Sequence, residues 1–139
     1  MTILCPLDFS AASPSLVAYA TALAVGMGAE LRLLHVCEPR EDPATAQQPD
    51  APASVPCAER LSSLRAAAEQ AGAAHVQTDI VRGEAASAIV AEARRWHADL
   101  IVIGAHGQTG LTRFLMGNTA ETVLRTAPCA TLLLKSPDN

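Results

Sequence analysis

Short apolar runs along the chain alternate with segments whose apolar residues recur at helical spacing. The runs are typical of buried strands, and the intervening segments are typical of helices that cover a sheet. We expect strands over residues 2–7, 31–36, 75–81, 100–103 and 129–134. We expect helices from residue 13 to the glycines at 26 and 28, and over residues 58–71, 85–96 and 119–125. This alternation predicts an α/β fold, with a parallel sheet covered on both faces.

Local residues mark the two ends of the first helix. Ser13 precedes Pro14, and these residue types favour the cap and the first turn of a helix. Gly26 and Gly28 follow the apolar stripe, and glycine commonly ends a helix. We therefore expect Ser13 to cap this helix and the two glycines to end it.

Residues 38–56 interrupt the pattern. Five of them are prolines, set among acidic and glutamine residues, so we expect a flexible loop here rather than a helix or strand. The part of the chain ahead of this loop supplies only two strands and one helix, too few for a separate domain. We therefore expect a single domain over residues 1–139.

Composition narrows the classes of function. Half of the residues are hydrophobic but only four are aromatic, so the core must be built from aliphatic side chains. The net charge is −4 and no basic cluster stands out, which argues against a nucleic-acid partner. No signal peptide is recognisable, and no segment is apolar over the length that a bilayer requires. We expect a cytoplasmic protein with no membrane partner.

The four cysteines are Cys5, Cys37, Cys57 and Cys129. They form no CxxC pair, and they show no Cys/His spacing of a known metal site. Three of them fall in predicted strands or at strand ends, where cysteine usually acts as a small buried hydrophobe. We expect structural thiols in a reducing compartment and no metal bound by the protein.

The histidines other than His106 give only weak indications of a function. His35 lies near the end of a predicted buried strand, and we expect nearby backbone groups to satisfy its ring. His75 and His97 lie at the ends of predicted elements, and we expect both to be exposed.

A glycine-bearing loop links the fourth predicted strand to the last predicted helix. It begins with Gly104-Ala105-His106-Gly107 and ends with Gly117-Asn118-Thr119. Glycine lets the backbone approach an anion closely, and the N–H groups at a helix start can bind phosphate. Neither GxxxxGK[ST] nor a GxGxxG after the first strand is present. The loop predicts a site for a nucleotide or another phosphorylated ligand, where it meets the tip of the first strand.

Several short motifs, spread over nearly the whole chain, occur together as they do in one known family. They are Pro6-Leu7-Asp8-Phe9-Ser10, Leu34-His35-Val36, Gly83-Glu84-Ala85, Ala98-Asp99-Leu100-Ile101-Val102-Ile103-Gly104 and Gly117-Asn118-Thr119-Ala120-Glu121, with Ala127-Pro128-Cys129 behind them. On these motifs the chain resembles the universal stress protein family. The resemblance implies a doubly wound, five-stranded parallel sheet in the order 3-2-1-4-5, a nucleotide-binding fold of the α-hydrolase-like kind.

The ATP-binding branch of that family carries the pattern Gly-x-x-Gly-x9-Gly-Ser/Thr. Gly104, Gly107 and Gly117 fit it, but Asn118 stands where Ser or Thr is expected. An asparagine amide can still donate a hydrogen bond to a phosphate, although it is bulkier than a hydroxyl. Thr119 follows at once and could supply the hydroxyl.

The resemblance implies an adenine nucleotide (ATP, ADP or AMP) as the ligand, and a Mg²⁺ ion could accompany it, held mainly by the phosphates. The binding residues that it implies are Pro6, Leu7, Asp8, Val36, Ile103, Gly104, Ala105, His106, Gly107, Gly117, Asn118 and Thr119. Asp8 would lie near the ribose and the phosphates, but its carboxylate could equally cap the turn before Ser13. Similarly, His106 and Arg113 could contact phosphate or remain solvated.

The function that the resemblance favours is an ATP-binding stress-response regulator without dedicated catalysis. It also implies a homodimer formed by the last strand, Ala130–Leu134, and a signalling partner that the sequence does not identify. Two alternatives stay open. The first is a dimeric interaction module that binds no ATP, in which Asn118 marks the lost phosphate site. The second is a weak ATPase, although the chain offers a single lysine, Lys135, outside the glycine loop.

Overall fold

The computed structural model describes residues 1–9, 12–37, 56–104 and 119–135. The described elements run in the order β1 (Thr2–Leu7), α1 (Ser13–Met27), β2 (Glu30–Cys37), α2 (Cys57–Gln70), β3 (Val76–Arg82), α3 (Ala85–Arg95), β4 (Leu100–Gly104) and β5 (Ala130–Leu134). Residues 119–126 are helical as well. Each strand and helix that the sequence predicts is present, with its ends shifted by at most a few residues. Most of the expected loop, residues 38–55, lies outside the described part.

The five strands form one parallel sheet in the order β3-β2-β1-β4-β5, as predicted. β1 is the central strand, and its neighbours are β2 on one side and β4 on the other. Because all pairs are parallel, the carboxyl ends of the strands meet at one edge of the sheet. β5 lies at an edge of the sheet, next to β4 alone.

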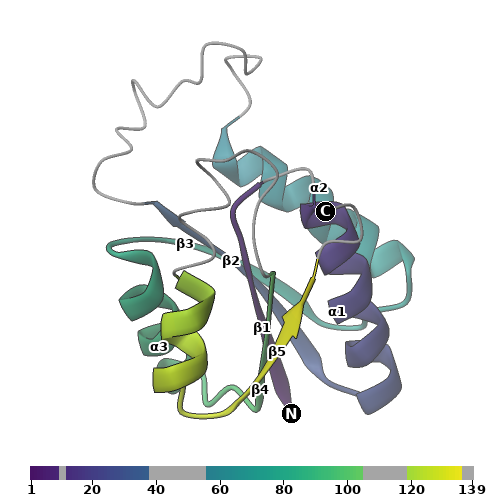
Figure 1. Ribbon diagram of the computed structural model, residues 1–139. Coiled ribbons are helices and arrows are strands. Elements are labelled where there is room, and N and C mark those ends of the chain that lie inside the picture. The colour runs from purple at the N-terminus through teal and green to yellow at the C-terminus, as the bar shows by residue number, and fades with distance from the viewer. Residues whose placement is uncertain (10–11, 38–55, 105–118, 136–139) are drawn as a thin grey trace.

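Helices cover both faces of the sheet (Figure 1). α1 and α2 pack on one face, and α3 and residues 119–126 pack on the other. Successive residues of β2 serve the two faces in turn: Leu31 and Leu33 join the core under α1 and α2, whereas Leu34 and Val36 join the core under α3. Both cores consist almost entirely of aliphatic side chains, as the composition predicts.

The structure corrects two details of α1. Its N-cap residue is Ala12, and Ser13 lies inside the helix with a buried hydroxyl that has no hydrogen-bond partner in the described residues. Gly26 also lies within the helix, and only Gly28 ends it, with φ of 65° and N–H bonds back to the last turn. Because a helix tolerates a glycine in its last turn, the sequence alone could not show which of the two glycines ends α1.

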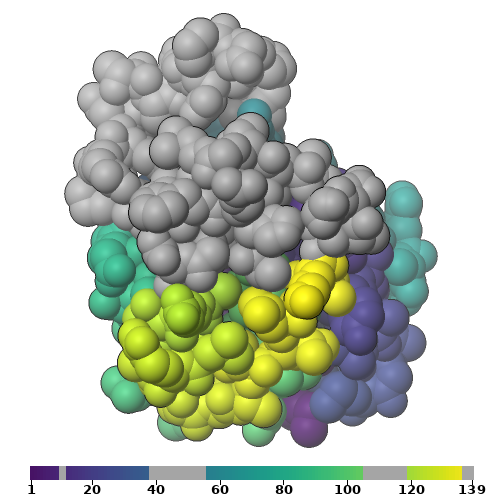
Figure 2. Space-filling view, viewed as in Figure 1, coloured from purple at the N-terminus to yellow at the C-terminus, as the bar shows by residue number. Residues whose placement is uncertain are grey.

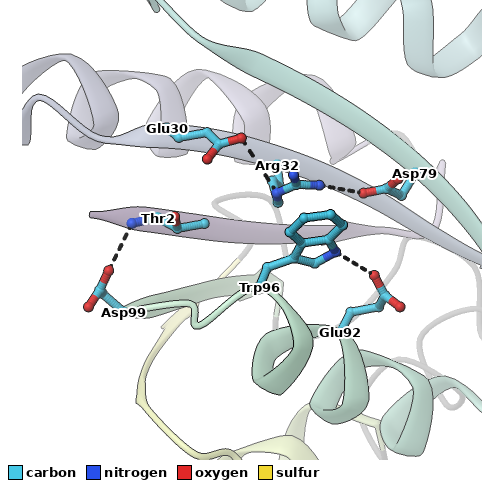
Figure 3. A network of polar contacts seen from close by, with 7 residues as sticks. All are labelled: Thr2, Glu30, Arg32, Asp79, Glu92, Trp96 and Asp99. Atoms are coloured by element: carbon cyan, nitrogen blue, oxygen red, sulfur yellow. Dashed lines mark hydrogen bonds and ion pairs between the residues drawn. The ribbon is translucent and has the colours of Figure 1, made fainter.

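A network of polar and aromatic side chains ties α3 to the first half of β2 (Figure 3). Arg32 is 9% exposed, its Nη1 donates to Asp79 of β3 at 2.9 Å, and its guanidinium lies 3.5 Å from the ring centroid of Trp96. Trp96 donates its indole N–H to Glu92 of α3 at 2.9 Å.

Among the described residues, no helix has both the length and the apolar character needed to cross a bilayer.

Candidate functional site

The candidate site lies where β1 and β4 end side by side. β1 ends at Leu7, which is buried, and Asp8 follows it with a half-buried side chain. The described helices that come next in the chain after β1 and β4 lie on opposite faces, since α1 covers one face and residues 119–126 cover the other. In open α/β sheets, ligands bind in the crevice that such a reversal of strand order creates.

Gly104 ends β4 at this edge, directly after the fully buried Ile103. Among the described residues, neither its backbone conformation nor its packing requires a glycine. Its φ lies outside the positive range that disfavours side chains, and a Cβ built on it would meet Leu16 Cδ2 at 3.8 Å, an ordinary van der Waals contact. The described residues therefore leave room for a methyl group at this position.

The structure brings together part of the predicted set of site residues. Leu7 and Asp8 at β1, Val36 near the end of β2 and Gly104 at β4 all lie at the carboxyl edge of the sheet. The remaining described members are Pro6, Ile103 and Thr119; the first two are buried in their strands, and Thr119 is 9% exposed at the start of helical residues 119–126. Outside the described residues lie Ala105, His106, Gly107, Gly117 and Asn118, together with Arg113.

An aromatic pair lies beside the end of β1. Phe9 has a positive φ of 60°, which is unusual for a bulky residue and turns the chain sharply after Asp8. Its ring stacks on His35, with the ring centroids 4.4 Å apart and an angle of 27° between the planes. The Nδ1 of His35 lies 3.0 Å from the carbonyl oxygen of Leu7, so a backbone group satisfies this nitrogen, although the group comes from the neighbouring strand rather than from the local chain. His75 and His97 are exposed, as predicted.

The groups that surround this pair could not be predicted from the sequence. The guanidinium of Arg60, from α2, lies 5.4 Å from the centroid of the Phe9 ring. One ring nitrogen of His35 and the sulfur atoms of Cys37 and Cys57 all lie within 4.8 Å of one another. The sequence pointed to Phe9 as a residue of this site only through its position after Asp8, in a chain with few aromatic residues. Cys37 and Cys57 lie far apart in the sequence, and no local spacing connects them.

The other two cysteines have different environments. Burial raises the pKa of Cys5 to about 12, because the core of the sheet cannot solvate a thiolate. Burial and then the nearby Asp99 carboxylate raise the pKa of Cys129. Both thiols are thus held in the neutral form, which is the less reactive one.

Comparison with protein-family models matches residues 1–135 to the universal stress protein family. Universal stress protein MJ0531 of Methanocaldococcus jannaschii is 40% identical over 79 residues, which is 57% of this chain and 46% of that protein. The matched stretch thus spans about half the length of such curated relatives.

Solved structures share the fold over nearly the full chain. Universal stress protein UspA from Lactobacillus plantarum superposes with a TM-score of 0.78 at 27% identity, covering 96% of this chain and 97% of that one. A universal stress protein crystallised in complex with cAMP superposes with a TM-score of 0.75 at 23% identity, covering 96% of each chain. At that identity the second comparison shows the shared fold alone.

Proposed function

The chain belongs to the universal stress protein family, and we propose that it binds an adenine nucleotide at the carboxyl edge of its sheet and acts as a stress-response regulator. The nucleotide is ATP or one of its products ADP and AMP. A protein of the same fold has been crystallised with cAMP, which agrees with this choice of ligand class.

The observation that carries the proposal is the unexplained glycine at the end of β4. Gly104 needs no positive φ, and the described residues leave space for a Cβ. A glycine that neither backbone nor packing demands is accounted for by a ligand that approaches the main chain closely. It ends the strand next to β1, the central strand that Asp8 follows, where the strand order reverses.

The proposed orientation follows from the chemistry at this edge. The phosphates lie over the loop that begins at Gly104 and against the helix start near Thr119, where N–H groups favour anions. The ribose lies near Asp8, and the adenine lies against the end of β2 near Val36. If Mg²⁺ accompanies the nucleotide, the Asp8 carboxylate offers the oxygen chemistry that this ion prefers, most simply through a bound water.

Calorimetric titration with ATP, ADP and AMP tests the proposal. The wild-type protein should release or absorb heat with a saturable isotherm for at least one of them. Gly104→Ala should bind at least tenfold more weakly while folding normally, because the new methyl group makes only an ordinary contact with Leu16 but crowds a ligand that lies against this backbone. Gly26→Ala, an exposed glycine in α1 with open space around it, is the matched control and should bind like the wild type. No heat with any of the three nucleotides would refute the proposal.

We further propose that β5 forms a homodimer with its copy. β5 is an edge strand, and Leu133 on it is 37% exposed, while Leu124 on helical residues 119–126 is 46% exposed. Figure 2 shows β5 at the surface between residues 119–126 and α1. An edge strand carrying apolar side chains is a liability that pairing with a second copy removes. Nucleotide occupancy would then alter the surface that the dimer presents to a signalling partner.

A second candidate function is favoured by Asn118. It replaces the Ser or Thr that the ATP-binding pattern requires, so the chain could instead act as a dimeric interaction module without a nucleotide. Titration separates the two, since only the regulator binds adenylates. We propose no dedicated catalysis: slow ATP hydrolysis would appear as linear phosphate release that Gly117→Val abolishes, and its absence is the expected result.

A further inference from the structure

Three side chains with metal-binding atoms meet at the carboxyl end of β2. His35 and Cys37 project from the same face of this strand because they are two residues apart. α2 covers that face, and its first residue is Cys57. The result is a mutual separation below 4.8 Å among one ring nitrogen and two sulfur atoms. None of the three residues belongs to the nucleotide site proposed above.

The hydrogen bond of His35 fits the ring for metal binding. The carbonyl oxygen of Leu7 can only accept, so the Nδ1 that lies 3.0 Å from it must carry the proton. Nε2 then keeps its lone pair and can act as a ligand. Histidines that bind metals usually donate their other ring N–H to a carbonyl or carboxylate in this way, which fixes both tautomer and orientation. Stacking on Phe9 restrains the ring further.

The positions of the two cysteines also suit a cation. Cys57 is the first residue of α2, a helix of 14 residues, so the start of this helix brings its sulfur to the end of β2. Cys37 and Cys57 are both partly exposed, which leaves an entry path from solvent. Tetrahedral zinc with Zn–S of about 2.3 Å and Zn–N of about 2.0 Å sets its ligand atoms roughly 3.3–3.8 Å apart. The observed spread of up to 4.8 Å needs a closure of about 1 Å.

We propose that Cys37, Cys57 and His35 bind one Zn²⁺ ion, with the fourth position left to water. Two thiolates and one imidazole are the soft and borderline donors that select zinc over Mg²⁺ or Ca²⁺. The ion joins the end of β2 to the start of α2. No metal site is expected from the sequence, which shows no Cys/His spacing of a known metal site; the three ligands come from two elements that only the fold brings together.

Zinc content and affinity test the proposal. The full chain is expressed without a polyhistidine tag, reduced, stripped with a chelator, incubated with Zn²⁺ alone and dialysed, and no nucleotide is added. Elemental analysis should find one zinc per chain. Competition with a chromophoric chelator should show that Cys37→Ser and Cys57→Ser each bind zinc at least tenfold more weakly, since the loss of an outer-shell partner alone costs about 10–100-fold. Cys129→Ser, at another partly exposed cysteine, should match the wild type.

Cobalt substitution identifies the ligands directly. Co²⁺ in the wild type should give a thiolate-to-metal charge-transfer band, and this band should weaken in each of the two cysteine variants but not in Cys129→Ser. His35→Gln should weaken binding in the same way, whereas His75→Gln, at an exposed position, should not; circular dichroism checks that each variant is folded. No zinc retained by the wild type would overturn the proposal, as would equal affinity in all cysteine variants. A Cys37–Cys57 disulfide in the isolated protein, with no zinc uptake after reduction, would overturn it in favour of a redox pair.

Discussion

Replacing Arg32 by methionine should lower the free energy of unfolding by about 1–3 kcal/mol. Methionine keeps an apolar chain over Trp96 but removes the guanidinium that bonds to Asp79 at 2.9 Å and lies 3.5 Å from the Trp96 ring centroid. The ring contact alone is worth about 0.5–2 kcal/mol. The substitution leaves Asp79 and Glu30 without this cation, but their side chains can be rehydrated.

Exposure decides the magnitude of the ion-pair contribution. The Arg32 side chain is 11% exposed and that of Asp79 is 33% exposed, so the pair lies between the exposed and the fully buried cases. Exposed pairs contribute about 0.2–1 kcal/mol, and removal of one partner from a buried pair costs about 3–5 kcal/mol. The Nε of Arg32 lies 3.5 Å from a Glu30 oxygen, a distance that allows attraction but makes no good hydrogen bond. We therefore expect Asp79→Asn to cost less than Arg32→Met.

A double-mutant cycle in urea measures the coupling between the two residues. Arg32→Met, Asp79→Asn and the double variant should yield a coupling free energy of about 1 kcal/mol that shrinks with added salt. Each single variant should keep the urea m-value of the wild type, because the fold is unchanged. A coupling below about 0.3 kcal/mol would refute the reasoning, since that is the error of additivity for independent sites.

Other predictions follow from particular positions. Because Cys5 has its pKa raised from 9.0 to about 12, the unfolded state loses this proton first as pH rises, so stability should fall by about 1.4 kcal/mol per pH unit between these values. Urea titrations of the wild type and of Cys5→Ala at alkaline pH check that the variant lacks this part of the slope. Gly28→Ala should destabilise by about 1 kcal/mol at φ of 65°, whereas Gly26→Ala in the helix should stabilise by roughly 0.5–1 kcal/mol in thermal melts. Leu133→Lys should convert the proposed dimer to a monomer in light scattering; a monomeric wild type would contradict that assignment.

Periodicity was sufficient to predict the strands and helices, because each element buries an apolar face and the alternation of strands with helices demands a parallel sheet. The order of the strands came instead from the family resemblance, and the structure confirms it. Local chemistry was less decisive. Ser13 has the residue type of a cap, yet it lies inside α1 with its side chain buried.

Contacts between distant elements could not be predicted from the sequence. The stacking of Phe9 on His35 depends on a positive φ just after β1, which no residue type signals at that place. The grouping of His35 and Cys37 with Cys57 depends on where α2 begins after a long connection. The backbone hydrogen bond of His35 was predictable, since a polar ring in a buried strand must find a partner.

The most direct test of the central claim is an NMR titration of the isotope-labelled protein with ATP. The account predicts chemical-shift changes that are largest for the amides of Asp8, Val36 and Gly104 at the carboxyl edge of the sheet. The indole N–H of Trp96, which Glu92 holds near the first half of β2, should not move and serves as an internal reference. Shifts centred on Trp96 or on α1, or no shifts at millimolar nucleotide, would contradict the account.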